Sequence, residues 1–428
     1  MAYVVSFIDR QIMALMVEPI RQDLGISDTQ ISLLLGLAFA IFYTLLGIPI
    51  GRMADLYSRR KIIVIGITVW CLMTAACGLA RNYAQLFAAR IGVGVGEAAL
   101  SPSALSMISD YFPKETRGRA VAFYTMGISI GVGLAMIIGS QVIAYVFSAP
   151  PVTLPIVGKL FAWQTVFVVV GLPGLLIAVL MATVKEPIRK EQIVQASIDG
   201  SQTHYIRFAQ VVAFIWQRRR MYVSHFLGMS IVGILSYGFY AWIPTMFIRT
   251  WDWTIQDIGL AYGVVTLLSG PLAVILAARM AESFAKKGYA DAHMRTALFG
   301  SLAGIVFAVA TPLMPNPYAA LLLLLPVSIG TSAATASGLS ALMMVTPNQM
   351  RAQTSAAYFF VVNILGLTVG PTGIALFTDF VFKADIMLRY SVASVSLLAG
   401  LFAAVFLFYN LRHYAAAFEE SNAWTVEK

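Results

Sequence analysis

Cysteine and histidine are scarce in this chain of 428 residues, which contains 2 and 4 of them respectively. Cys71 and Cys77 both lie in an apolar stretch, and the histidines have no ligand spacing, so the sequence predicts no disulfide scaffold and no metal site. We find no nucleophile–base pair, no soluble catalytic domain and no cleavable signal peptide. We therefore expect no cofactor, and an enzyme, including one that modifies membrane lipid, is disfavoured.

Charge is also scarce. Charged residues make up 11% of the chain and hydrophobic residues 59%, whereas about a quarter of a soluble domain is charged. The net charge of +9 could suggest a nucleic-acid partner, but the basic residues are spread over short loops. We therefore expect an integral membrane protein that lies in a lipid bilayer and binds no nucleic acid.

Twelve apolar runs have about the length that crosses a bilayer as a helix. They cover residues 2–20, 30–50, 62–80, 85–109, 119–147, 161–184, 222–248, 256–278, 295–314, 318–345, 353–378 and 390–411. The sequence thus predicts an all-α membrane protein with an N-terminal six-helix half (1–184), a linker (185–221) and a C-terminal six-helix half with a short tail (222–428). The first run has no polar lead, which would fit a trimmed N-terminus.

The basic residues predict the orientation in the membrane. Loops on the side of the linker, together with the C-terminal tail, carry 21 of the 29 lysines and arginines, and loops on the other side carry 6. Lys and Arg are enriched in cytoplasmic loops. We therefore expect the linker and both termini in the cytoplasm, with the protein in a bacterial inner membrane.

The two predicted halves repeat each other in short stretches. Residues 51–60 read GRMADLYSRR, and residues 278–287, at the corresponding place in the second half, read ARMAESFAKK. Pro113 and Arg117 likewise correspond to Pro347 and Arg351. Corresponding loops on the same side predict parallel halves, related by an axis along the membrane normal.

Two charges interrupt the fourth apolar run. Arg90 and Glu97 lie seven residues apart, so they project from one face of a helix, with Gly92, Gly94 and Gly96 between them. Charged residues at this depth cost several kcal/mol and are rare. One interpretation is a structural ion pair. The other, which we favour, is a proton or substrate site inside a transporter.

These stretches resemble the major facilitator superfamily. GRMADLYSRR is similar to its loop motif, with Ser58 where the family often has a second glycine, and Arg90 followed by spaced glycines is similar to its fourth-helix motif. Asp9-Arg10 in the first run, with Gly94-Val-Gly-Glu97-Ala, resembles the spinster group of sphingolipid and lysophospholipid transporters and its bacterial homologues. Bacterial transporters of organic anions share Asp-Arg-Gln in helix one. The resemblance implies the major facilitator fold and a proton-driven mechanism.

If the helices pack as in the superfamily, Asp9 can meet Arg90. Movement of a guanidinium toward or away from a buried carboxyl changes the affinity of that carboxyl for a proton. We therefore predict that Asp9, Arg90 and Glu97 couple transport to protons. A static bridge between two helices is the alternative for Asp9 and Arg90, and a carboxyl satisfied by neighbouring polar groups is the alternative for Glu97. Arg10 points about 100° away from Asp9 on the helix.

The resemblance also places a gate at the cytoplasmic ends of the helices. It implies that Asp55 lies near the start of the eleventh span, where a helix presents unsatisfied N–H groups and partial positive charge. Arg59 against Asp110, at the end of the fourth span, would complete a gate that holds the two halves closed. The alternative is that the basic residues only anchor the loop.

A substrate cavity is predicted more coarsely. The candidates are Arg10, Tyr237, Tyr240, Tyr358 and Asn363, although for the aromatic residues and Asn363 ordinary helix packing is the favoured explanation. Aromatic side chains with few polar groups suit an amphipathic substrate. We expect a monomer that exports a lysolipid-like or other amphipathic molecule against protons. The alternative is a proton-coupled symporter of a small organic anion, with Arg10 or Arg90 holding its carboxylate.

Overall fold

The computed structural model describes residues 1–154, 158–188, 208–347 and 350–423. Nearly all of these residues are helical, and the described part has one two-stranded antiparallel hairpin, β1 (Thr153–Leu154) with β2 (Gly158–Lys159). The helices before the linker are α1 (Ala2–Leu15), α2 (Val17–Leu24), α3 (Asp28–Leu35), α4 (Leu37–Leu56), α5 (Arg59–Cys77), α6 (Tyr83–Glu97), α7 (Leu100–Tyr111), α8 (Lys114–Ser148), α9 (Ala162–Gly171) and α10 (Gly174–Thr183).

The later helices are longer and less often interrupted. They are α11 (Phe208–Gln217), α12 (Arg219–Trp251), α13 (Ile255–Lys286), α14 (Ala292–Ala310), α15 (Pro317–Met344), α16 (Arg351–Leu376) and α17 (Leu388–Ala423), with short 3-10 or π turns at Thr311–Leu313, Phe377–Phe382 and Asp385–Met387. Below, α1–α10 are called the N-terminal group and α11–α17 the C-terminal group.

Eleven segments in the described residues are long and apolar enough to cross a membrane. The one remaining predicted span is the first, at residues 2–20. It corresponds to α1 and α2, which are separated at Met16. Pro19 explains the break, because proline has no N–H to donate to the carbonyl of Leu15, four residues earlier. The predicted all-α membrane fold with twelve spans is therefore confirmed.

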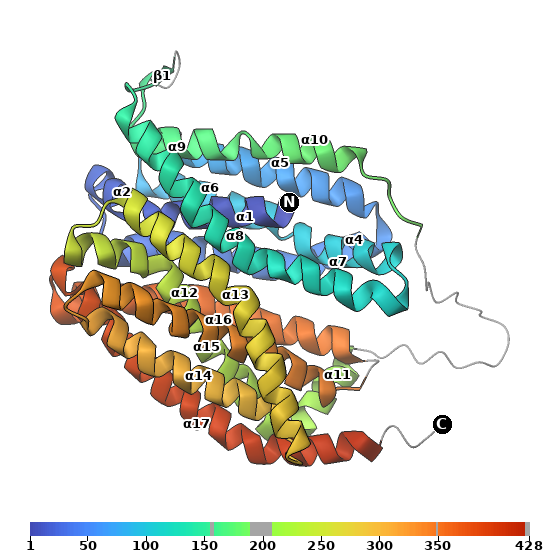
Figure 1. Ribbon diagram of the computed structural model, residues 1–428. Coiled ribbons are helices and arrows are strands. Elements are labelled where there is room, and N and C mark those ends of the chain that lie inside the picture. The colour runs from blue at the N-terminus through green and yellow to red at the C-terminus, as the bar shows by residue number, and fades with distance from the viewer. Residues whose placement is uncertain (155–157, 189–207, 348–349, 424–428) are drawn as a thin grey trace.

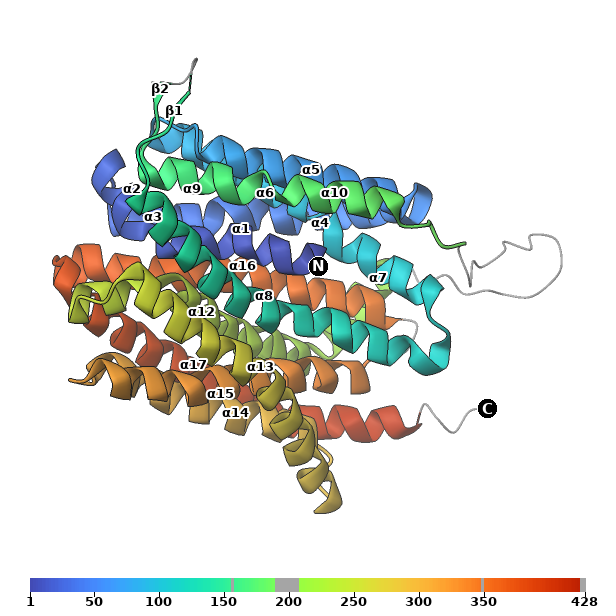
Figure 2. The same ribbon diagram turned by 45° about the horizontal axis from the view of Figure 1, so that its top comes forward.

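Figures 1 and 2 show the two groups stacked side by side, with their helices roughly parallel. In Figure 1 the last turn of α10 and helix α11 lie at the right, at the end that we call the linker end, and α2 and the loop before α17 lie at the left, at the end that we call the far end. Three sets of helices join the groups: α8 packs along α13, α3 and α4 pack against α16, and α1 packs against α12. One core cluster of buried apolar side chains extends across both groups.

Glycines bring the backbones of the two groups into direct contact. In the seam between α8 and α13, a Cβ on Gly263 would lie 2.6 Å from Cγ1 of Ile137 and 2.8 Å from the carbonyl oxygen of Gly133. At the junction of α3 and α4, a Cβ on Gly36 would lie 2.1 Å from the carbonyl oxygen of Leu367 in α16. Neither position has room for a side chain, so both fix how closely the groups approach.

Candidate functional site

An ion pair between Arg10 and Glu97 lies inside the N-terminal group. Nε and Nη2 of Arg10, on α1, lie 2.6 and 2.5 Å from Oε2 of Glu97, the last residue of α6. The Glu97 side chain is 1% exposed. The guanidinium of Arg10 lies over the rings of Phe7, Phe39 and Tyr43, at 5.0, 4.4 and 4.7 Å from their centroids. Arg10, predicted from the sequence as a cavity residue, is therefore the partner of Glu97. We call the aromatic rings of Phe7, Phe39 and Tyr43 around its guanidinium the aromatic surround of Arg10.

Arg90 is buried next to this pair, and both of its hydrogen bonds to described residues go to backbone carbonyls. Its Nε donates to the carbonyl of Leu34 at 3.3 Å, and its Nη1 donates to the backbone carbonyl of Asp9 at 3.4 Å. The predicted contact between the side chains of Asp9 and Arg90 is therefore not formed in this structure. The side chains that meet between α1 and α6 are instead Arg10 and Glu97, whereas the prediction paired Asp9 with Arg90.

The Asp9 carboxylate is fully buried, and neither of its oxygens has a hydrogen-bond donor among the described residues. Trp70 and Thr74 of α5 lie within interaction range of it. The indole N–H of Trp70 and the hydroxyl of Thr74 are themselves buried and form no hydrogen bond with a described partner. Asp9 is thus an acid without a counterion in contact, between one arginine that pairs elsewhere and another that contacts its backbone.

Ion pairs close the far end between the two groups. Arg249, at the end of α12, binds both carboxylate oxygens of Asp28 at 2.6 and 2.8 Å and also pairs with Glu18. Arg21 lies 3.1 Å from Asp28 and 3.0 Å from Asp385, in the turn before α17. Asp28 is fully buried, and the Arg249 side chain is 7% exposed. All ion pairs between the two groups that the structure describes lie at this end.

The sequence interpretation missed these far-end residues. Arg21 and Arg249 entered it only as basic residues of short loops, and the acids were not considered. A usable signal existed, since Glu18, Arg21 and Asp28 lie close together in sequence at the end of one predicted span and the start of the next.

The predicted contact between Arg59 and Asp110 is present at the linker end, and a third residue joins it. Arg59, the first residue of α5, pairs with Asp110 and lies 3.0 Å from Oε1 of Glu186. These two contacts of Arg59 join α5 to the end of α7 and to the stretch that follows α10, and the gate between the two halves stays a prediction. The side chain of Asp55 lies outside the described residues.

Glu186 caps the N-terminus of α5. Its carboxylate accepts hydrogen bonds from the hydroxyl of Ser58 at 2.7 Å and from the backbone N–H groups of Arg59 and Arg60 at 3.2 and 2.8 Å. Partial burial would raise the pKa of Glu186, but these hydrogen bonds and the one from the Arg59 side chain lower the pKa to about 2. The residues just after α10 are thereby fastened to the loop between α4 and α5.

Two of the predicted cavity residues contact each other. The hydroxyl of Tyr237 on α12 donates to Oδ1 of Asn363 on α16 at 3.2 Å. Tyr237 is also within electrostatic range of Arg10 and Tyr43, so it lies near the Arg10–Glu97 pair of the N-terminal group. Tyr240, one turn further along α12, is partly buried and interacts electrostatically with Tyr237.

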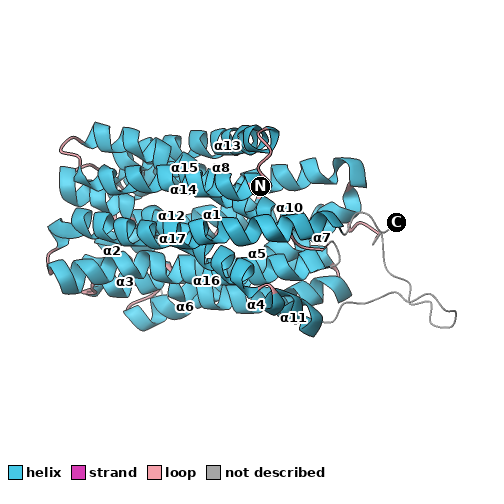
Figure 3. Cartoon of the chain, turned by 90° about the horizontal axis from the view of Figure 1, so that it is seen from below, coloured by secondary structure: helices cyan, strands magenta, loops and turns pink. Residues whose placement is uncertain are grey.

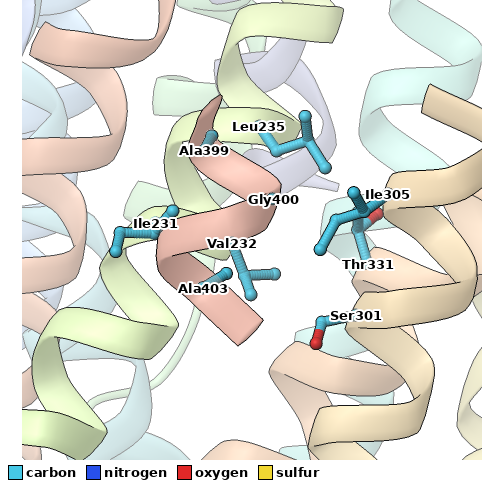
Figure 4. A pocket seen from close by; sticks show the side chains of 9 residues that line it. All are labelled: Ile231, Val232, Leu235, Ser301, Ile305, Thr331, Ala399, Gly400 and Ala403. Carbon is cyan, nitrogen blue, oxygen red and sulfur yellow. The ribbon is translucent and has the colours of Figure 1, made fainter. Parts of the chain in front are cut away.

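Tyr358 lies apart from this place. It is 1% exposed and packs in the core of the C-terminal group, with its ring centroid 5.7 Å from that of His225. A pocket in the same group, drawn in Figure 4, is lined by α12, α14, α15 and α17 side chains such as Leu235, Ile305 and Thr331, and it has no room for a water molecule. Neither feature offers a place for a substrate in this conformation.

Comparisons with known proteins agree with this architecture. The family model of the Major Facilitator Superfamily matches residues 1–371. An MFS-type efflux pump of Mycolicibacterium smegmatis is 25% identical over 384 residues, which is 87% of this chain and 81% of the pump. Protein spinster of Drosophila melanogaster is 26% identical over 336 residues, which is 77% of this chain and 50% of that protein.

A solved structure has the same fold along nearly the whole chain. It is a bacterial homologue of the human lysosomal transporter spinster, crystallised in an inward-facing and unoccupied conformation. It superposes with a TM-score of 0.78 at 23% identity, and the match covers 99% of this chain and 96% of that one. These findings show a membrane transporter and not an enzyme, and the chain belongs to the Major Facilitator Superfamily, with the spinster group among its relatives.

Proposed function

We propose that this protein is a proton-coupled secondary transporter that works by alternating access and exports a lysolipid-like or other amphipathic molecule. The observation that carries the proposal is the state of Asp9, a fully buried acid that forms no ion pair with a described residue and has only the neutral donors of Trp70 and Thr74 near its oxygens. Such an acid, next to an ion pair and a second arginine, is suited to gain and lose a proton during a transport cycle.

The geometry around Asp9 suits its neutral form. Burial of a carboxylate without a counterion costs several kcal/mol, and a buried group avoids that cost by binding a proton. Glu97, the other acid nearby, is stabilised as an ion by Arg10. The two carboxyls therefore have different roles in the proposal: Asp9 carries the proton, and Glu97 keeps Arg10 in place.

Arg90 is positioned to act on Asp9 when the proton leaves. Its Nη1 already contacts the backbone carbonyl of Asp9, so the carboxylate of the same residue is a short side-chain movement away. In the proposed cycle, loss of the proton draws Arg90 to the carboxylate and favours one state, and protonation releases it and favours the other. The proton shifts the equilibrium because it binds one state better.

The two groups of helices would be the moving halves. We propose halves at 1–184 and 222–428 joined by the linker at 185–221, with the linker end in the cytoplasm of a bacterial inner membrane. The far-end ion pairs would break when the protein opens outward. The proposed role of Asp55 against the start of α16, and of the Arg59–Asp110 pair as its support, belongs to the state that is closed at the linker end.

The aromatic surround of Arg10 supports an amphipathic substrate. Tyr3 and Tyr124 stack at 4.6 Å between centroids, and Tyr43 and Tyr237 lie near Arg10. Large apolar faces with a few hydroxyls and one amide, that of Asn363, are suited to a lipid-like molecule with a small polar head. The organic-anion alternative is less well supported, since Arg10 is paired and Arg90 is 1% exposed.

Transport by purified protein in liposomes with an imposed pH gradient tests the proposal. A panel of lysophospholipids and small organic anions would identify the substrate class. Asp9→Asn mimics the neutral acid, so it should abolish accumulation driven by the gradient while substrate binding remains. Glu97→Gln serves as the comparison, and we expect a smaller loss. Gradient-driven accumulation by Asp9→Asn equal to that of the wild type would show that the proton is carried elsewhere.

A further inference from the structure

The short helix α11 lies between the linker and the first long helix of the C-terminal group. Figures 1 and 3 show it at the linker end, and Figure 3 shows it at the edge of the bundle. One face of α11 packs inward: Val211 is 1% exposed, and Phe214 and Ile215, three and four residues later, pack against the core cluster that contains Met221 and Tyr222. This spacing places the three side chains on one side of the helix.

The opposite face of α11 is apolar and exposed. Ala209, Val212, Ala213 and Trp216 are all exposed, and their spacing of three, four and seven residues forms one continuous stripe. Val212 is 46% exposed and Trp216 is 66% exposed. A helix that buries one apolar face in the protein and presents a second one outward is expected where that second face meets lipid.

Arginines follow the stripe directly. Arg218 is held by the protein itself, since it pairs with Glu420 of α17 and its guanidinium lies 4.1 Å from the ring centroid of Phe214. Arg219 and Arg220 are exposed, and Arg219 lies 5.8 Å from the ring centroid of Trp216. The exposed tryptophan and two exposed arginines thus form one surface, which we call the α11 patch.

The α11 patch lies at the depth of lipid headgroups. The membrane-spanning helix α12 begins at Arg219 and has 33 residues, which is roughly 50 Å of helix, while the hydrocarbon core is about 30 Å thick. A centred span would therefore place Arg219 about 10 Å outside the hydrocarbon, among the headgroups. Tryptophan prefers this interface, and arginines next to a transmembrane helix attract anionic lipid.

We propose that the α11 patch binds anionic phospholipid of the leaflet on the linker side, with the apolar stripe against the acyl chains and Arg219 and Arg220 on the headgroups. The positive charge of the two exposed arginines favours a lipid whose headgroup has a net negative charge. Such a headgroup carries a phosphate without a positively charged amine next to it. Since α11 packs against both α12 and α16, the lipid would be held against the two helices that carry Tyr237 and Asn363.

The proposal can be tested by tryptophan quenching in nanodiscs. The discs contain phosphatidylcholine with a small fraction of lipid brominated on its acyl chain, either phosphatidylglycerol or phosphatidylcholine. The difference in fluorescence between the wild type and Trp216→Phe gives the signal of Trp216. Each basic residue at an anionic surface favours the lipid roughly fivefold. Brominated phosphatidylglycerol should therefore quench Trp216 at a mole fraction at least fivefold below that needed with brominated phosphatidylcholine.

A double variant and a matched control complete the test. Arg219→Gln/Arg220→Gln should make the two brominated lipids equally effective. Lys286→Gln/Lys287→Gln removes the same charge from the end of α13, away from an exposed tryptophan, and should leave the preference intact. Equal quenching of wild-type Trp216 by both lipids, or no quenching by either, would overturn the proposal. A control variant that loses the preference as the arginine variant does would also overturn it.

Discussion

Arg249 holds the far end closed, so its removal should open that end. The perturbation is Arg249→Ala, which deletes the bidentate contact with Asp28 and the pair with Glu18. Asp28 is fully buried and Arg249 nearly so. Removing one partner of a buried pair costs about 3–5 kcal/mol, because the other charge is left uncompensated.

The neighbouring Arg21 reduces this cost. It remains 3.1 Å from Asp28 and supplies part of the missing charge, so we take the lower bound, about 3 kcal/mol. These contacts join the two groups and would be lost on opening, so the cost applies to the state with the far end closed. At 1.4 kcal/mol for each tenfold change, the open state should gain roughly 100-fold in relative population.

Distances between spin labels at Gln22 and Ile386 measure the opening. Both residues are exposed at the far end, one in each group, and the two native cysteines are buried. The variant should show a longer distance that the wild type does not populate visibly. Arg389→Ala is the matched control, since Arg389 lies at the same end but has its described contacts within its own group, with the carbonyls of Pro312 and Met314 and the rings of Trp251 and Tyr390. An unchanged distance distribution in Arg249→Ala would refute the gating role.

Three further predictions concern the linker end, the seam and the orientation. Glu186→Gln should lower the melting temperature at pH 7, and the difference from wild type should shrink as the pH falls from about 4 toward the folded pKa of about 2. The reason is that an acid with a lowered pKa stabilises the folded protein only while it is ionised there. Melting temperatures measured over this pH range, with the exposed Glu419→Gln as the control, test this, and a difference that does not change with pH would contradict it. Gly263→Leu should abolish transport, since the new side chain meets the backbone of Gly133; wild-type flux in liposomes would argue against a tight seam. A cysteine in place of the exposed Ile188 should not react with an impermeant reagent in intact cells and should react after lysis. Strong labelling of intact cells would contradict a cytoplasmic linker end.

The sequence was sufficient for the spans because length and hydropathy determine them locally. Even the interrupted first span was correct as a unit, since α1 and α2 together occupy the predicted run. The pairing of the buried charges was a different matter. Asp9 and Arg10 are adjacent, so they point about 100° apart, and the rotation of α1 about its own axis decides which of them faces the charged residues of α6. That rotation depends on packing by all neighbouring helices and leaves no local trace in the sequence.

Contacts between distant segments were missed for the same reason. Asp28 is the first residue of α3 and Arg249 lies in the last turn of α12, and each on its own is typical of a solvated helix end. Glu186 was read as one charge in a polar linker, although it serves as the cap of α5. Only the folded arrangement shows that residues so far apart in the sequence are partners.

The contact at Gly36 has a consequence for the leak of protons through the protein. There the backbone of the N-terminal group touches the carbonyl of Leu367 with no space for even a methyl group. A chain of water molecules across the protein would short-circuit the proton gradient, because protons hop along such a chain without any substrate. Where backbone packs directly on backbone, as at Gly36, there is no room for such a chain of water molecules. A larger residue at Gly36 would force the groups apart, and if the proposed coupling to protons holds, we expect such a variant to leak protons without moving substrate.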